Sequence, residues 1–172
     1  MLKGIKWQIV LLTLALALGM LFAGFQFYHE KYLPDKISKE IYGINSVKSV
    51  KVETKSKGYI IDVKLDKVDN LMETYKNIQA KVLKYPVKIE INIIDNSDNK
   101  LNNIYYKSQF AVYEGIQKGD YLNMFNFIKD LSKTENVEFN INMDSKNIYL
   151  DFRDGSNYFY KIVPRGPSEG GI

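Results

Sequence analysis

Two carboxylates in the stretch AVYEGIQKGD have the residue types and spacing that general acid–base chemistry requires. Glu114 and Asp120 are separated by Gly119, which can end a helix. If the chain turns back there, the two side chains could form a carboxylate pair, and neighbouring tyrosines could complete a catalytic or small-ligand site. The alternative is that Glu114 faces solvent and pairs with Lys118 one helical turn later, while Asp120 caps the next helix.

The tract DNSDNK, residues 95–100, suggests two further kinds of chemistry. Its first, third and fifth positions supply oxygen, as in a calcium loop, but Lys100 replaces the required glycine and Tyr106 the bidentate glutamate. Ser97 and Lys100 have the spacing of a serine nucleophile and its base, without the companion motifs that this chemistry needs. A polar turn in which Ser97 or Asp98 caps a helix accounts for every residue of the tract.

Other catalytic and metal-binding constellations are missing from the sequence. The absence of cysteine excludes disulfides, thiol catalysis and Cys-ligated metals, and His29 is the single histidine. This one histidine, at the end of the apolar run, can supply neither a Ser-His-Asp triad in the folded body nor a multi-His metal site. We therefore expect a protein that is not an enzyme and has no catalytic, cofactor-binding or metal-binding residues.

The charge pattern argues against nucleic acid as a partner. The chain carries a net charge of +4, of which Lys3 and Lys6 at the extreme N-terminus supply two. Only Arg153 and Arg165 are arginines, whereas nucleic-acid surfaces concentrate arginine and lysine on one face. Lysines elsewhere alternate with acidic residues, which is typical of a solvated surface.

The uncharged run WQIVLLTLALALGMLFAGFQFY, residues 7–28, is the strongest signal in the sequence. As a helix it would span about 33 Å, enough for one membrane crossing, and it exceeds the apolar core of a cleavable signal peptide. Aromatic residues border both of its ends, as in a membrane-interface belt. We expect an uncleaved anchor. A signal peptide cleaved near Ala17 or Gly19 and a core helix of a soluble protein are the alternatives.

The anchor divides the chain into regions. Residues 1–6 form a basic head that we expect in the cytoplasm, residues 7–28 the anchor in the lipid bilayer, and residues 29–34 a juxtamembrane linker. A short basic head before a single span usually stays cytoplasmic, so residues 32–172 are expected outside the cell membrane.

Residues 35–95 predict an α-β-β-α-β module. Asp35 can cap a first helix, period-two alternation follows on both sides of Gly58, and helical spacing returns from Leu71 to Leu83. Pro86 precedes PVKIEINIID, the clearest half-buried strand. In element order alone, the module resembles the small ring-building and BON-type domains of bacterial envelope assemblies. The resemblance carries no motif and assigns no functional residue.

Residues 96–164 predict an α-α-β-β-β module. A helix from about Lys100 to Gln117 precedes the widely apolar stretch YLNMFNFIKDLS, and three alternating strands follow. The overall class is therefore α+β, with two modules that either build separate sheets or share one six-stranded sheet. Residues 165–172 are too polar to order themselves and predict a disordered tail.

Tyrosine is unusually abundant, with 13 in the chain. The alternation of the last strands places Tyr149, Tyr158 and Tyr160 on the face opposite the aliphatic residues, and Tyr106 could lie away from the core as well. Exposed tyrosines would suit contact with protein or glycan, but filling a sheet–helix core is the favoured interpretation. We expect a single-pass, signal-anchored, extracytoplasmic protein of a bacterial envelope that binds or assembles with another envelope protein or with itself. An envelope enzyme or small-ligand receptor near Glu114 and Asp120 is the alternative.

Overall fold

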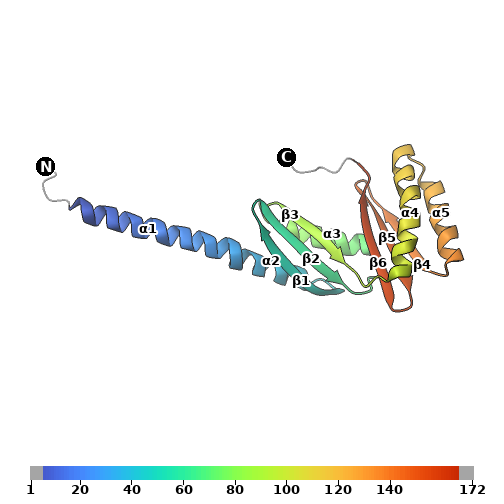
Figure 1. Cartoon of the computed structure of the whole chain (residues 1–172), viewed down its shortest axis with the longest axis horizontal. Helices are drawn as coiled ribbons and strands as arrows, with labels where there is room; N and C mark the ends of the chain where they lie inside the picture. The colour runs from blue at the N-terminus through green and yellow to red at the C-terminus, as the bar shows by residue number, and fades with distance from the viewer. Residues whose placement is uncertain (1–5, 167–172) are drawn as a thin grey trace.

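The computed structural model describes residues 6–166 and has mixed α and β structure with two three-stranded sheets. One long helix extends away from the rest of the chain, and the two sheets follow with their helices (Figure 1). The expected α+β class is confirmed. Most of the expected head (residues 1–6) and most of the expected tail (residues 165–172) lie outside the described residues.

The N-terminal helix α1 (Trp7–Phe27) buries no residue against the rest of the protein. It continues through a π-helical turn, η1 (Tyr28–Tyr32), into α2 (Leu33–Tyr42). The apolar part has a mean hydropathy of 2.2 and is long enough to cross a membrane, a criterion that a signal sequence near the N-terminus also meets. The alternative of a soluble core helix is wrong, because the apolar part is entirely unburied.

Residues 29–34, expected as a linker, are helical, and Asp35 lies in the first turn of α2 rather than at a helix cap. The π-helical turn explains how the helix passes Pro34. Proline lacks a backbone N–H and crowds the preceding turn, and the wider turn directly before it absorbs that mismatch. Leu33 and Pro34 are buried, so packing against the domain stabilises the continuation.

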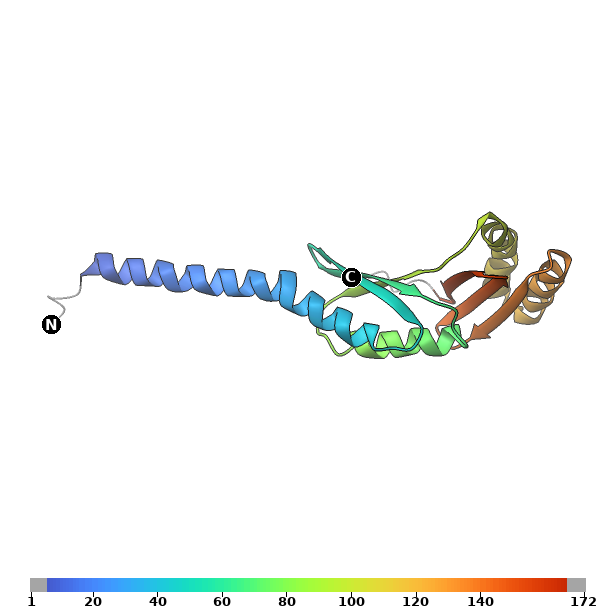
Figure 2. The ribbon, with the colours of Figure 1, turned by 90° about the horizontal axis from the view of Figure 1, so that it is seen from below.

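The first sheet consists of β1 (Val47–Lys55), β2 (Gly58–Leu65) and β3 (Ile89–Ile94), in that order. β1 and β2 form an antiparallel hairpin, and β3 pairs parallel to β2 after the crossover helix α3 (Leu71–Val82). Alternate residues of β2 are buried, and they share one hydrophobic core with the apolar stripes of α2 and α3. Figure 2 shows both helices beside the same sheet.

Gly58 is required where the hairpin meets the edge of β3. Its φ is +141°, and a Cβ there would lie 2.1 Å from the Lys88 carbonyl oxygen. That oxygen accepts a hydrogen bond from the Tyr59 N–H at 2.9 Å. A side chain at position 58 would therefore separate the hairpin from the α3–β3 connection.

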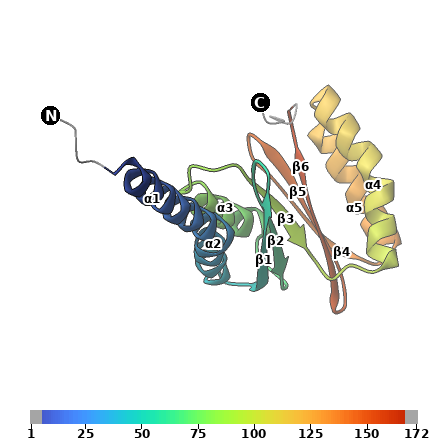
Figure 3. The same cartoon turned by 60° about the vertical axis from the view of Figure 1, so that its left-hand side comes forward.

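The second sheet consists of β4 (Glu138–Met143), β5 (Asn147–Asp154) and β6 (Asn157–Pro164), all antiparallel and in chain order. The helices α4 (Asn99–Lys118) and α5 (Tyr121–Thr134) pack on one of its faces. They bury Ile148, Leu150 and Phe152 of the central strand in a second core. Figure 3 shows the two helices on the side of this sheet turned away from the first sheet.

The alternative of one shared six-stranded sheet is wrong. The strands form two separate ladders, joined only by an isolated antiparallel bridge between Asn96 and Tyr158 within the described residues. The helices α4 and α5 follow Asn96 directly and cover the second sheet, so the chain leaves the first ladder after β3.

Tyrosines on the other face of the second sheet hold the two halves together. Tyr149, Tyr158 and Tyr160 are buried within the core of the first half, in agreement with the core-filling interpretation rather than with exposure. The Tyr158 hydroxyl donates to the Leu65 carbonyl at 3.0 Å. The Tyr160 hydroxyl donates to Asp66 O at 3.1 Å and accepts from the Val68 N–H at 3.0 Å.

A buried ion pair strengthens the same junction. The carboxylate of Asp151, 2% exposed, accepts from Arg153 Nε at 3.0 Å and from Nη2 at 2.5 Å. The same guanidinium donates to the Val68 carbonyl oxygen, and the contact with Asp151 raises the pKa of Arg153. The segment after β2 is therefore held by side chains from both β5 and β6.

Asp144, in the β4–β5 turn, links the halves at a second point. Its carboxylate accepts from the Lys146 and Asn147 N–H groups, both at 2.8 Å, and from the Tyr149 hydroxyl at 3.0 Å. Lys76 of α3 lies 3.1 Å from it. Burial acts to raise the pKa of Asp144, but the two N–H donors and Lys76 outweigh burial and hold it well below its ordinary value.

Removing the Tyr160 hydroxyl should weaken the junction. Y160F leaves the Val68 N–H and Asp66 carbonyl without this partner, which should lower the free energy of unfolding by about 1–3 kcal/mol. Y106F removes an exposed hydroxyl and should change it by less than about 0.5 kcal/mol. Urea denaturation followed by near-UV circular dichroism measures both, and equal effects would contradict the role of Tyr160.

The contribution of Asp144 should depend on pH. Because its pKa is lowered in the folded state, its stabilisation is complete above the unfolded value near 3.9 and is lost as the pH falls. D144N should therefore be less stable than the parent at pH 7, and the difference should shrink below about pH 4. Urea midpoints across this range test the expectation. A difference that stays constant down to the lowest pH would refute it.

Candidate functional site

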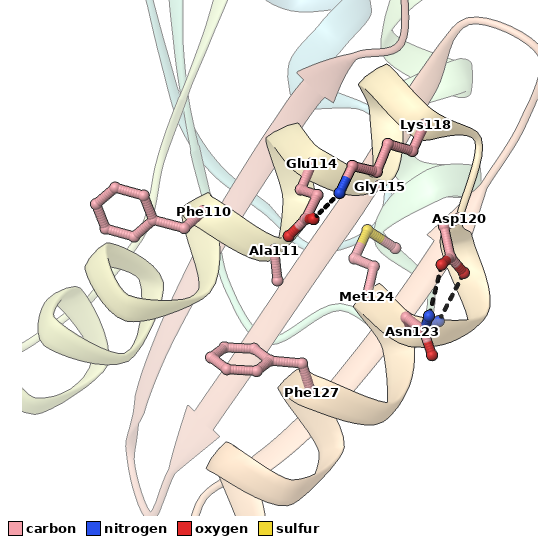
Figure 4. Close-up of a pocket in the computed structure, with 9 residues that line it drawn as sticks. All are labelled: Phe110, Ala111, Glu114, Gly115, Lys118, Asp120, Asn123, Met124 and Phe127. Atoms are coloured by element: carbon pink, nitrogen blue, oxygen red, sulfur yellow. Dashed lines mark hydrogen bonds and ion pairs between the residues drawn. The ribbon is translucent and has the colours of Figure 1, made fainter.

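A groove lies between α4 and α5 near the turn that joins them (Figure 4). Its volume is about 410 Å³. Apolar residues form its floor and walls, and charged residues lie toward its closed end. The lining consists of Phe110, Ala111, Glu114, Gly115, Lys118, Asp120, Asn123, Met124 and Phe127.

Gly115 determines how closely the two helices approach. A Cβ at this position would lie 3.0 Å from Met124 Cβ and 3.3 Å from the Asp120 carbonyl oxygen. The helix therefore contacts α5 through backbone at this turn. Gly119 then ends α4 in the left-handed conformation, with φ at +71°, and reverses the chain.

The groove contains both Glu114 and Asp120, but they do not form a pair. Glu114 binds the Lys118 ammonium one turn later on α4, and this contact raises the pKa of Lys118. Asp120 caps α5, accepting from the Asn123 N–H at 3.2 Å and from the Asn123 amide at 2.5 Å. Figure 4 shows Glu114 directed to Lys118 and Asp120 directed to Asn123.

This arrangement matches the alternative in which Glu114 pairs with Lys118 and Asp120 caps the next helix. General acid–base catalysis needs a proton-transferring group directed at a reacting atom, whereas each oxygen pair here already engages a neighbouring donor. What the groove offers is an apolar surface with a polar rim that carries charges of both signs.

Exposed aromatic side chains extend the groove along α4. Tyr106, Phe110 and Tyr113 recur at helical spacing, and Phe110 is 66% exposed. Tyr106 and Phe110 pack edge to face, with ring centroids 6.1 Å apart. With Phe127 on the facing helix, these residues form the α4–α5 aromatic face. Exposure was expected from the sequence only for Tyr106, although Phe110 and Tyr113 also lie outside the buried stripe of α4.

The DNSDNK tract has a structural role. Asp95 accepts from the Tyr160 N–H at 2.8 Å, and Asp98 caps α4 by accepting from the Leu101 N–H at 2.9 Å. The Leu101 N–H is the main reason that the pKa of Asp98 is lowered, although burial opposes it. Lys100 binds Asp154 at 2.7 Å, so its ammonium is committed to an ion pair.

His29 lies in η1, directly after α1. The Tyr59 hydroxyl donates to its carbonyl oxygen at 2.9 Å and lies 3.1 Å from its Nδ1. Between residues 6 and 166, no group of three or more His, Cys, Asp or Glu residues is placed to hold a metal ion.

Comparison with models of protein families, with curated proteins and with solved structures finds no match. The function must be argued from the chain's own geometry.

Substitution of the two groove carboxylates should separate their roles. D120A removes the cap of α5 and should lower the free energy of unfolding by about 1 kcal/mol. E114A removes one exposed ion pair and should change it by less than about 0.5 kcal/mol. Thermal unfolding of the two variants measures the difference. A loss of ligand binding or activity in both, with neither destabilised, would instead identify a functional carboxylate site.

Proposed function

We propose that this chain is a single-pass, membrane-anchored protein of a bacterial envelope whose extracytoplasmic domain binds another envelope protein. The observation that carries the proposal is the α4–α5 aromatic face. It lies at the end of the molecule remote from α1 (Figures 1 and 2).

The position of this face favours a protein partner over lipid. If α1 crosses the bilayer, the α4–α5 aromatic face is held away from that membrane, with both sheets between them. Exposed apolar surface with a polar rim is the composition of protein-binding surfaces. Phe110 and Phe127 flank the groove, so a partner that inserts an apolar side chain between them suits both its shape and its chemistry.

Retention of α1 is supported by its continuity with the domain. The helix enters α2 without a linker, and Leu33, Ile37 and Ile41 of α2 are buried in the first core. Cleavage at Ala17 or Gly19 would leave several exposed apolar residues on this helix, among them Leu21, Phe22 and Phe25.

One observation favours a second candidate, a small-ligand receptor. The groove volume of about 410 Å³ falls within the range of small-ligand sites. Both groove carboxylates already accept hydrogen bonds from neighbouring donors, which favours a receptor over an enzyme.

Photo-crosslinking in intact cells tests the partner. Full-length protein with benzoylphenylalanine at Phe110 or Phe127 should yield one defined heterologous adduct or a dimer in the membrane fraction. The matched control places the same residue at Ile94, an exposed apolar position on the first sheet, and should not yield that adduct. Recovery of uncrosslinked monomer alone from Phe110 and Phe127, under conditions that saturate crosslinking, would overturn the proposal.

A further inference from the structure

A cluster of lysines lies at the end of the domain from which α1 departs. The turn between β1 and β2 carries Lys55 and Lys57, and Lys88 enters from the adjacent α3–β3 connection. These residues line one shallow depression of about 190 Å³. Resting on the proposed retention of α1, we propose that this hairpin tip, Lys55–Gly58 together with Lys88, binds the anionic phosphate groups of the bilayer that α1 crosses.

The hairpin tip is fixed in height relative to α1. The hydroxyl of Tyr59, the second residue of β2, donates a hydrogen bond to the His29 carbonyl oxygen at 2.9 Å. β2 runs from the tip away from α1, as Figures 1 and 2 both show. Lys57 lies in the two-residue turn that precedes β2, so the hairpin tip is on the α1 side of Tyr59.

That height coincides with the edge of the headgroup layer. α1 has 21 residues and is about 31 Å long, which matches a hydrocarbon core of about 30 Å. His29 therefore lies within the first turn beyond the hydrocarbon boundary. The hairpin tip, on the membrane side of Tyr59, lies at the boundary between hydrocarbon and headgroups, and its lysine side chains can extend into the headgroup layer, which is about 5–8 Å deep.

The domain has no linker through which it could move away from the membrane. The chain is helical from Tyr28 to Tyr42, and Leu33 and Pro34 are buried. Because the first sheet packs on α2, the hairpin tip keeps its position relative to the end of α1.

The charge of the tip suits phosphate. Lys57 and Lys88 are exposed and make no ion pair with any residue from 6 to 166. Glu53 is shared between Lys51 at 2.8 Å and Lys55 at 3.3 Å, and Glu90 also lines the depression. Lysine remains in excess over these two carboxylates. Each lysine near an anionic membrane surface favours contact about fivefold.

The absence of cysteine allows one reporter to be placed at a time in the full-length chain. S56C puts an environment-sensitive fluorophore on the hairpin tip, and S156C puts it on the exposed β5–β6 turn as a matched control. The protein is reconstituted in phosphatidylcholine vesicles with or without about 30 mol % phosphatidylglycerol. Quenching by a lipid spin-labelled at its headgroup is then measured.

The residue-56 reporter should be quenched several-fold more than the residue-156 reporter when phosphatidylglycerol is present. This excess should fall with phosphatidylcholine alone and in about 1 M salt, because screening weakens lysine–phosphate attraction. In the S56C background, the triple variant K55Q/K57Q/K88Q should also reduce this excess quenching. The matched control K129Q/K133Q/K146Q, which changes three exposed lysines elsewhere on the domain, should leave it unchanged.

Equal quenching of the residue-56 and residue-156 reporters would overturn the inference. A third reporter, L14C in the middle of α1, separates this outcome from failure of the anchor. If a chain-labelled lipid quenches the L14C reporter but the headgroup label does not quench the S56C reporter, the contact between hairpin tip and lipid is rejected and the anchor is retained. If neither reporter is quenched, the anchor is rejected as well.

Discussion

The structure depends on burial of both faces of the second sheet. Its central strand, β5, is buried continuously from Ile148 to Phe152, with aliphatic and Phe side chains toward α4 and α5 and tyrosines toward the first half. The polar groups on the inner face are satisfied by Arg153 and by the backbone of Asp66 and Val68. A buried carboxylate such as that of Asp151 is tolerated only when paired and hydrogen-bonded. Two small cores thereby become one continuous body, and the α4–α5 aromatic face is fixed relative to the distant end of α1.

The long helix transmits that fixed geometry to the membrane in the proposed function. The π-helical turn at Tyr28–Tyr32 lets the chain pass Pro34 without leaving the helical path. In consequence the hairpin tip and the aromatic face occupy opposite ends of one body. In the proposed function, one end would lie at the headgroups and the other would be presented to a partner, a division of surfaces that a flexible linker would not maintain.

The elements with regular periodicity could be predicted from the sequence, and the features set by long-range contacts could not. Alternation predicted β3 and the two hairpins, the uncharged run predicted the apolar helix, and Asp98 and Asp120 cap helices as the residue types suggested. The same alternation placed Tyr149, Tyr158 and Tyr160 on the face opposite the aliphatic residues. It could not show that a second core covers that face. Pro34 indicated a break because proline usually ends a helix, and a π-helical turn leaves no simple sequence pattern. Glu114 and Asp120 do line one groove, but their committed partners, Lys118 and Asn123, decide what that groove can do.

The central claim is that α1 is retained and holds the domain outside the membrane. It is tested most directly by intact mass measurement after labelling whole cells that produce the L122C variant. Leu122 is 78% exposed on α5 and the parent chain has no cysteine, so a membrane-impermeant maleimide reports one site. The account predicts that the membrane fraction contains the full 19.9 kDa chain with one added label. A labelled species that lacks the N-terminal residues, or a chain labelled only after lysis, would contradict it.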